Sequence, residues 1–194
     1  MAHEGDADRR KAAELPEGDV VRILLEQHGR IRDLFAEVKG AQGEVKQQAF
    51  DELRALLAVH ETAEEMVIRP VAKDTAGKAE VEARNEEEHE ANEVLMSLER
   101  MDVTSADFER EFADFERAVV AHAEKEENEE FPTIRAGRSE EQLQRMGRML
   151  RAAEKVAPTR PHPSAAGKPM RQFAVGPFAS LVDRTRDAIT AASR

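Results

Sequence analysis

The chain lacks cysteine, tryptophan and tyrosine, and its aromatic content of 4% comes from eight phenylalanines. Without cysteine it cannot form disulfides, zinc–thiolate sites or iron–sulfur clusters, and it cannot use thiol catalysis. Without tyrosine it cannot carry a tyrosyl radical. A glycine-rich phosphate loop and a serine or threonine nucleophile pattern are missing as well. Any chemistry of this chain therefore depends on other side chains.

Composition and charge indicate a helical protein. Charged residues make up 36% of the 194 residues and hydrophobic residues 40%, a balance typical of long, solvated helices and an all-α fold. The formal net charge of −11 argues against nucleic acid and anionic membranes as partners, because both bind basic patches. The first fifteen residues contain no apolar run, so we expect no signal peptide or membrane span and a cytoplasmic location.

Four segments have the apolar periodicity of amphipathic helices, and they lie at about 19–39, 44–73, 77–101 and 105–131. Each has one histidine in the middle of its apolar face. From His28 to His60 is 32 residues and from His89 to His122 is 33, so the spacing repeats. Two helical hairpins with matched offsets predict an approximately two-fold bundle core.

The segments outside these four helices differ in composition. A further helix is expected to begin at Ser139, because Gln142 completes a capping-box pattern with it. Proline, glycine and small residues then indicate a linker before a last amphipathic segment. The predicted parts are a flexible N-terminus (1–18), the bundle (19–135), an additional helix (136–156), and a linker with a C-terminal amphipathic helix (157–194).

Two of the four histidines have a glutamate four residues later, which places both side chains on one helix face. A carboxylate on an apolar face costs several kcal/mol unless a cation accompanies it, and we expect no lysine or arginine to point inward with the same periodicity. A metal centre accounts for both observations. The predicted ligands are His28, His60, Glu64, His89, His122 and Glu126.

Two other interpretations of these residues remain. A single histidine on an apolar face is more often a hydrogen-bonded core residue than a ligand, and a glutamate beside such a face is often exposed. A bundle without metal would follow if the histidines were inert. The occurrence of one histidine in each helix, in register within the hairpins, favours the metal centre.

The kinds of ligand indicate which metals fit. Imidazole and carboxylate without thiolate suit iron or manganese better than zinc. Six ligands exceed the capacity of one tetrahedral zinc, whereas two glutamates between facing helices can bridge a pair of ions. We therefore expect two metal ions, each with an open position for dioxygen, peroxide or water.

The order of these residues resembles that of the hemerythrin-like, or HHE cation-binding, domains: a lone His, His-x-x-x-Glu, a lone His and His-x-x-x-Glu. The resemblance covers about 19–135, and it includes Leu24 four residues before His28 and the sequence Glu-Glu-Phe-Pro at 129–132. It implies an up-down-up-down four-helix bundle around a non-haem di-iron centre with an oxo or hydroxo bridge. It also implies that the histidines are terminal ligands and that Glu64 and Glu126 bridge the irons.

The chain departs from the oxygen-carrying hemerythrins in its third helix. Those proteins bring two histidines, four residues apart, from that helix, whereas Asn85 and Glu93 stand at this spacing from His89. Asn85, Glu93 and Glu61 are candidates to complete the site there, against the alternative that the glutamates are simply solvated. The missing histidine opens a coordination position, which favours reaction with peroxide or nitric oxide over reversible oxygen carriage.

Two functional hypotheses follow. In the first, the chain is a non-haem di-iron protein that binds or reduces dioxygen, hydrogen peroxide or nitric oxide. A catalase-like disproportionation of peroxide would then protect against oxidative stress. In the second, it is an iron- or oxygen-responsive sensor or interaction module, whose C-terminal tail reports whether the site is loaded. Whether the chain is an enzyme differs between the two. For both we expect a small-molecule ligand and a monomer or weak homodimer.

Overall fold

The computed structural model describes residues 4–75, 78–155, 157 and 159, and the secondary structure of these residues is helical. The predicted linker and C-terminal amphipathic helix lie outside the described residues, apart from Ala157 and Thr159. No helix within the described ranges is both long and apolar enough to cross a membrane.

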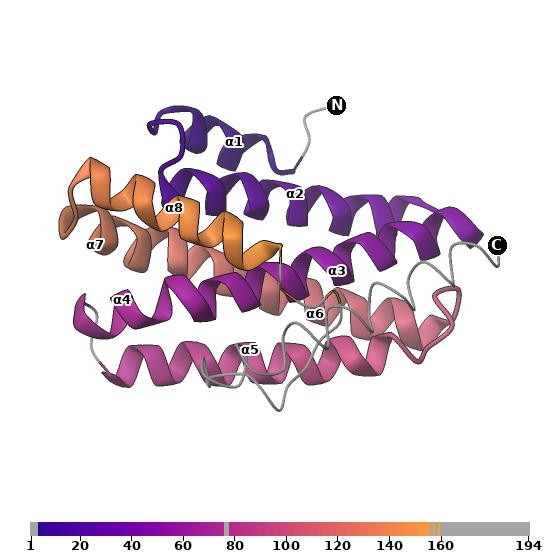
Figure 1. Ribbon diagram of the computed structural model, residues 1–194. Coiled ribbons are helices and arrows are strands. Elements are labelled where there is room, and N and C mark those ends of the chain that lie inside the picture. Colours follow the sequence, from indigo (N-terminus) through magenta and orange to yellow (C-terminus); the bar gives the residue numbers. More distant parts are fainter. Residues whose placement is uncertain (1–3, 76–77, 156, 158, 160–194) are drawn as a thin grey trace.

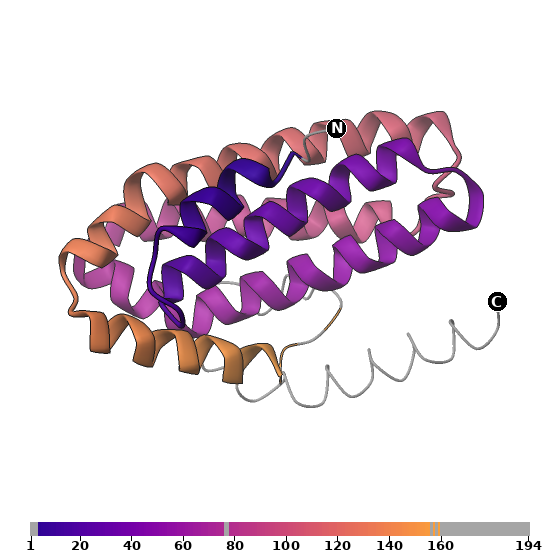
Figure 2. The same cartoon turned by 90° about the horizontal axis from the view of Figure 1, so that it is seen from above.

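Four long helices run side by side with alternating direction and form the body of the molecule (Figure 1, Figure 2). They are α2 (Val20–Gly40), α3 (Gly43–Val67), α5 (Lys78–Leu98) and α6 (Ala106–Lys125). The predicted all-α, up-down-up-down four-helix bundle is therefore confirmed. The additional helix is present as α8 (Glu140–Glu154), which packs against α2 and α3.

Side-chain caps fix where several of these helices begin. The Asp19 carboxylate accepts a hydrogen bond from the backbone N–H of Val21 at 2.8 Å, at the start of α2. Ser139 and Gln142 form the predicted capping box at the start of α8. These caps satisfy N–H groups that lack a partner within the helix, and so they determine the residue at which each helix begins.

Two breaks redirect the chain near one end of the bundle. A short helix, α4 (Arg69–Thr75), follows α3 after Ile68, and a π-helical turn, η1 (Glu126–Glu130), joins α6 to α7 (Phe131–Ala136). Pro70 and Pro132 lie in the first turns of α4 and α7, where a missing N–H costs little. These breaks bring extra polar side chains into the bundle.

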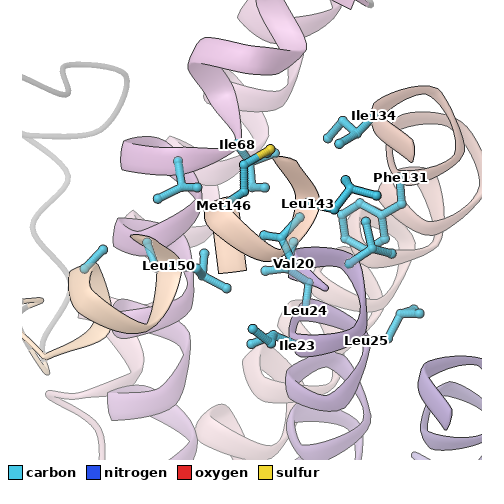
Figure 3. Close-up of a cluster of buried hydrophobic side chains, with 14 of the residues drawn as sticks. Val20, Ile23, Leu24, Leu25, Ile68, Phe131, Ile134, Leu143, Met146 and Leu150 are labelled. Carbon is cyan, nitrogen blue, oxygen red and sulfur yellow. The ribbon is translucent and has the colours of Figure 1, made fainter. Parts of the chain in front are cut away.

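The apolar core consists of two clusters. One joins α8 to α2 and to the α4 and α7 end of the bundle; Figure 3 shows Leu143, Met146 and Leu150 of α8 beside Val20 and Leu24 of α2. The other lies at the opposite end and is rich in phenylalanine rings. His28 on α2 and His60 on α3 fall between the residues of the two clusters, and Glu64 lies between Ala63 and Val67 of the first cluster. The site is therefore shielded at both ends by apolar packing.

The N-terminal segment differs from our expectation of a flexible stretch over residues 1–18. Residues Asp6–Ala13 form a helix, α1, that packs along α2 (Figure 1). Arg9 pairs with Asp33 of α2 at 2.6 Å, and Gly5 approaches Gly29 so closely that a Cβ on Gly5 would lie 2.0 Å from the Gly29 carbonyl oxygen. This helix is polar, so its order comes from tertiary ion pairs that sequence periodicity does not reveal.

Candidate metal centre

Histidine and glutamate side chains from α2, α3, α5, α6 and η1 converge in the middle of the bundle in two overlapping groups. Within each group the potential ligand atoms lie within 4.8 Å of one another. The two-histidine group consists of His28, His60, Glu64 and Glu126, and the one-histidine group of Glu64, Glu88, His122 and Glu126. Five of the six predicted ligands therefore meet in space, and Glu64 and Glu126 belong to both groups.

The two His-x-x-x-Glu pairs face the same point, as their spacing predicts. His60 Nε2 lies 3.6 Å from Glu64 Oε2, and His122 Nε2 lies 3.2 Å from Glu126 Oε1. These separations are those of side chains one helical turn apart on a common face. Each pair offers one imidazole nitrogen and one carboxylate to the same position.

Glu126 lies between the two groups. Its Oε1 atom faces His122, and its Oε2 atom lies 3.5 Å from His28 Nε2. The side chain is completely buried. A carboxylate that presents one oxygen to each group has the arrangement that a bridging ligand needs, so the position of Glu126 fits two adjacent cations.

Each of the three converging histidines has a carboxylate or amide oxygen at its other ring nitrogen. Such a partner fixes the tautomer, orients the ring, and leaves Nε2 for a metal. The Nδ1 contacts are His28 to Glu127 at 3.0 Å, His60 to Gln27 at 2.8 Å, and His122 to Glu87 at 3.0 Å. The sequence-based reasoning did not identify these three partners, since Gln27, Glu87 and Glu127 immediately precede or follow core-facing positions and look like solvated helix residues.

Several buried atoms at the centre lack a hydrogen-bond partner among the described residues: His28 Nε2, Glu64 Oε1 and Glu126 Oε2. Buried polar atoms are nearly always satisfied, so three such atoms close together need a physical reason. All three belong to the two-histidine group. The donor set, two imidazoles and two carboxylates, fits a divalent or trivalent metal ion of borderline to hard character.

The electrostatics of the centre are those of crowded carboxylates. Burial raises the pKa of Glu64 well above its ordinary value, and the adjacent Glu126 adds to this effect. Burial opposes charge on Glu126 as well, but His122 and other cationic neighbours hold its pKa well below the usual range. Burial lowers the pKa of His60 to about 3, so its imidazole is neutral, as ligation requires.

His89 is the predicted ligand that the structure does not bring to the centre. Its side chain is 41% exposed and lies 3.5 Å from Glu93, which is also exposed. The preceding residue, Glu88, takes the inward position and is 3% exposed. One residue along a helix corresponds to a rotation of about 100°, so His89 and Glu88 face different directions. The expectation for His89 therefore differs from the structure.

A signal for Glu88 was present in the sequence. Leu98 and Leu95 are fully buried on α5, and steps of three or four residues back from them lead to Asn92 and Glu88, which are buried too. The prediction of His89 as a ligand places the histidine, and not Glu88, on the inward face. Of the candidates near His89, Glu61 accepts a hydrogen bond from Asn92 at 2.6 Å, Glu93 is exposed, and the Asn85 side chain lies outside the described residues.

An arginine enters the centre, contrary to our expectation that no cation would point inward. Arg69 is 4% exposed, and its Nη2 atom pairs with Glu88 and lies 2.9 Å from Glu126. Arg69 is the first residue of α4, directly after the interruption between α3 and α4 at Ile68. The helical pattern of the sequence gave no indication of this interruption.

The acidic run from Glu124 to Glu130 divides into two faces. Glu124 and Glu129 are exposed, whereas Glu126, Glu127 and Glu130 turn inward in or beside the π-helical turn. The wider π turn alters which residues share a face, and such turns often occur at functional sites. Four of the seven positions are exposed and the other three are not, so the run is solvated only in part.

The family can be identified from this arrangement together with a comparison of sequences. A family model described as the hemerythrin HHE cation-binding domain matches residues 19–134, more than half of the chain. The chain belongs to this hemerythrin HHE family. The resemblance found in the sequence is thereby confirmed, and helices α1 and α8 lie outside the matched region.

Two similar proteins carry the same family name. An uncharacterized hemerythrin-like protein of Schizosaccharomyces pombe is 28% identical over 134 residues, which cover 68% of this chain and 66% of the yeast protein. The crystal structure of a hemerythrin HHE cation-binding domain-containing protein from Mycobacterium kansasii matches with a TM-score of 0.63 and 22% identity. That match covers 87% of this chain and 98% of the other. At this identity the structural match supports the fold alone.

A cavity of about 570 Å³ adjoins the centre of this hemerythrin-like bundle. It contacts His28, His60 and His122 on one side, and apolar residues such as Phe115 and Val119 line another part. Exposed residues of α5 and α6, among them Glu90 and Asp114, also border it, so it opens between these two helices. The cavity connects the candidate ligands with solvent along a largely apolar path.

The contrast between Glu88 and His89 provides a direct test of the ligand set. We expect Glu88→Ala to lower metal affinity about 10- to 100-fold, because it removes one of four groups around one position. His89→Ala, a change at the exposed neighbour, should leave affinity within about twofold. Metal analysis and calorimetric titration of both variants measure the effect. The reverse ranking would restore His89 as the ligand and exclude Glu88.

Proposed function

We propose that this protein is a non-haem di-iron protein that binds or reduces dioxygen, hydrogen peroxide or nitric oxide. The observation that carries the proposal is the pair of ligand groups that share Glu64 and Glu126. A single ion would need only one such group. Two groups with common carboxylates correspond to two ions with bridging ligands.

Different residues would hold the two ions of such a pair. His28 and His60 would hold one iron and His122 the other, with Glu88 on the second and Glu64 and Glu126 between them. Imidazole and carboxylate ligands support iron in both its reduced and oxidised states. When bound, a di-iron pair supplies two electrons to an oxidising ligand. The protein residues orient the ligands and limit access of water.

The surroundings support a small, neutral ligand. The cavity reaches the histidines past apolar side chains, among them Leu57, Val94 and Phe115, which offer little to an ionic substrate. The net charge of −11 also disfavours anionic macromolecules. We propose peroxide turnover in the cytoplasm by a monomer or weak homodimer as the most specific form of this function.

Metal analysis and spectroscopy of the full-length protein test the proposal. After aerobic expression we expect about two irons per chain and the absorption of an oxo-bridged diferric centre. Addition of hydrogen peroxide should release dioxygen, and nitric oxide should change the spectrum of the reduced protein. Protein that contains no iron after expression in iron-rich medium, and that takes up none on titration, would rule out the di-iron function.

A specific contact favours the sensor as a second candidate. Glu154, the last residue of α8, accepts a hydrogen bond from Gln27 at 2.6 Å, and the Gln27 side-chain oxygen lies 2.8 Å from His60 Nδ1. A change at His60 is thus linked to the end of α8, where the predicted tail begins. Iron-dependent proteolysis within 157–194, in protein that binds iron but does not turn over peroxide, would favour this function over the enzyme.

A further inference from the structure

Arg69 contacts the two ligand groups to different extents. Its guanidinium contacts all three carboxylates of the one-histidine group: Glu88 in a close ion pair, Glu126 at 2.9 Å and Glu64 at 3.8 Å. Glu64 and Glu126 are shared with the two-histidine group, so the ion pair with Glu88 is the contact that belongs to the one-histidine group alone. Of the buried atoms without a hydrogen-bond partner, His28 Nε2 belongs to the two-histidine group alone. All three carboxylates of the one-histidine group therefore contact the guanidinium, whereas both imidazoles of the two-histidine group lie outside these contacts.

The guanidinium is held firmly in this place. Its second terminal nitrogen, Nη1, lies 3.1 and 3.0 Å from the two oxygens of Glu130, which belongs to neither ligand group. The Arg69 side chain is 4% exposed, and a buried guanidinium stays charged. Glu130 therefore anchors Arg69 from outside the centre, while Nη2 reaches the potential metal ligands.

Glu88 and Glu126 cannot give the same oxygen lone pairs fully to Arg69 and to a metal ion. Both interactions depend on the same negative charge, and a second metal ion would add two or more positive charges within a few ångströms of the guanidinium. Arg69 also contacts Glu64 and Glu126 of the two-histidine group, but among the described residues no hydrogen bond joins an arginine or lysine to His28 or His60. Binding of an ion at the one-histidine position is therefore less favourable in free energy than binding at the two-histidine position.

We infer that Arg69 is an internal counter-cation of the one-histidine group, and that it competes with the second metal ion for Glu88 and Glu126. This inference rests on the proposed metal centre and adds an order of filling. The first ion binds at His28 and His60, and the second binds only as Nη2 of Arg69 gives up its carboxylates. Arg69 also keeps the clustered carboxylates together before metal arrives, so it stabilises the fold in the metal-free state.

A manganese titration of the chelator-treated, full-length chain tests the inference, because Mn²⁺ stays divalent when it binds. For the natural sequence we expect two calorimetric binding steps, the second at least about tenfold weaker than the first. Arg69→Met removes the charge and retains much of the side-chain length. It should strengthen the second step at least about tenfold and change the first by less than about threefold.

The same variant should be less stable without metal. Removal of one partner from a buried charge cluster leaves uncompensated carboxylates, so the thermal midpoint of metal-free Arg69→Met should fall by roughly 10 °C. Saturating Mn²⁺ should recover most of this loss, since the ions replace the missing charge. If metal-free Arg69→Met does not fold, the titration is made with Arg69→Lys. Lysine keeps the positive charge but cannot reproduce the contacts of both Nη1 and Nη2. The second binding step should therefore strengthen by a smaller factor.

Arg54→Met is the matched control. Arg54 is also a buried arginine, 2% exposed, and pairs with Glu99 at 3.1 Å, but it does not belong to either ligand group. Its loss should lower the thermal midpoint with and without Mn²⁺ and leave both binding steps unchanged.

Two results would overturn the inference. A second binding step that is unchanged or weaker in Arg69→Met and Arg69→Lys would assign Arg69 a purely supporting role. Equal affinity of the two steps in the natural sequence would remove the order of filling. Failure of the natural sequence to bind any metal is a different result, because it contradicts the proposed function itself.

Discussion

Glu126→Ala should abolish stable binding of both metal ions. Glu126 is the residue whose two oxygens face opposite histidines, with Oε1 toward His122 and Oε2 toward His28. Its removal takes a ligand from each group and leaves His122 without the carboxylate that is one turn away. We expect iron content after purification to fall from about two to below about 0.2 per chain, and the visible absorption of the centre to disappear.

Glu129→Ala is the control for this prediction. Glu129 lies three residues later in the same acidic run, but its side chain is 65% exposed. It should retain full iron content, which would show that loss of one negative charge near the site is not sufficient. Circular dichroism of both variants shows whether the bundle still forms. Iron content near two per chain in folded Glu126→Ala would contradict the bridging role.

The largest effect on stability is expected for Phe112→Ala. Phe112 is 1% exposed, and its ring centroid lies 5.3 Å from those of both Phe35 and Phe108, at the end of the bundle away from α7 and α8. Alanine leaves a cavity among these rings, so the free energy of unfolding should fall by about 3–5 kcal/mol. Urea or thermal denaturation of the metal-free proteins measures this difference.

The metal centre should survive this change in protein that remains folded. Phe112 lies ten residues from His122 on α6, or about 15 Å along the helix. Iron content per folded chain should therefore remain close to that of the natural sequence. Val45→Ala is the matched control, because Val45 is 64% exposed and its change should alter stability by less than about 0.5 kcal/mol. Equal loss in both variants would show that the aromatic cluster does not hold the bundle together.

The sequence predicted what depends on local spacing. Apolar residues at helical intervals located the four long helices, and the capping box at Ser139 located the fifth. The spacing of four residues placed Glu64 beside His60 and Glu126 beside His122. A helix brings such neighbours together whatever the rest of the fold does, so these contacts are encoded within one helical turn.

Local spacing failed where the helical period changes or where the face of a helix is polar. The α5 face contains glutamates on several sides, so composition did not distinguish Glu88 from His89. The α-helical pattern is interrupted at Ile68, and the π turn at Glu126–Glu130 changes which residues share a face. Arg69 reaches the candidate ligands, and Glu130 turns inward to pair with Arg69, next to these two interruptions. A regular helical period predicted neither position.

By itself, the sequence determined an all-α bundle with histidine and glutamate candidate ligands at its centre, because the helical period dictates which side chains share a face. Tertiary structure alone decided the partners that lie far apart in the chain. It brought Glu127 to His28, Gln27 to His60, and Arg69 to Glu126. The physical reason is that these contacts depend on how helices bend, rotate and pack against one another, which is set by the burial of the whole core rather than by any one segment.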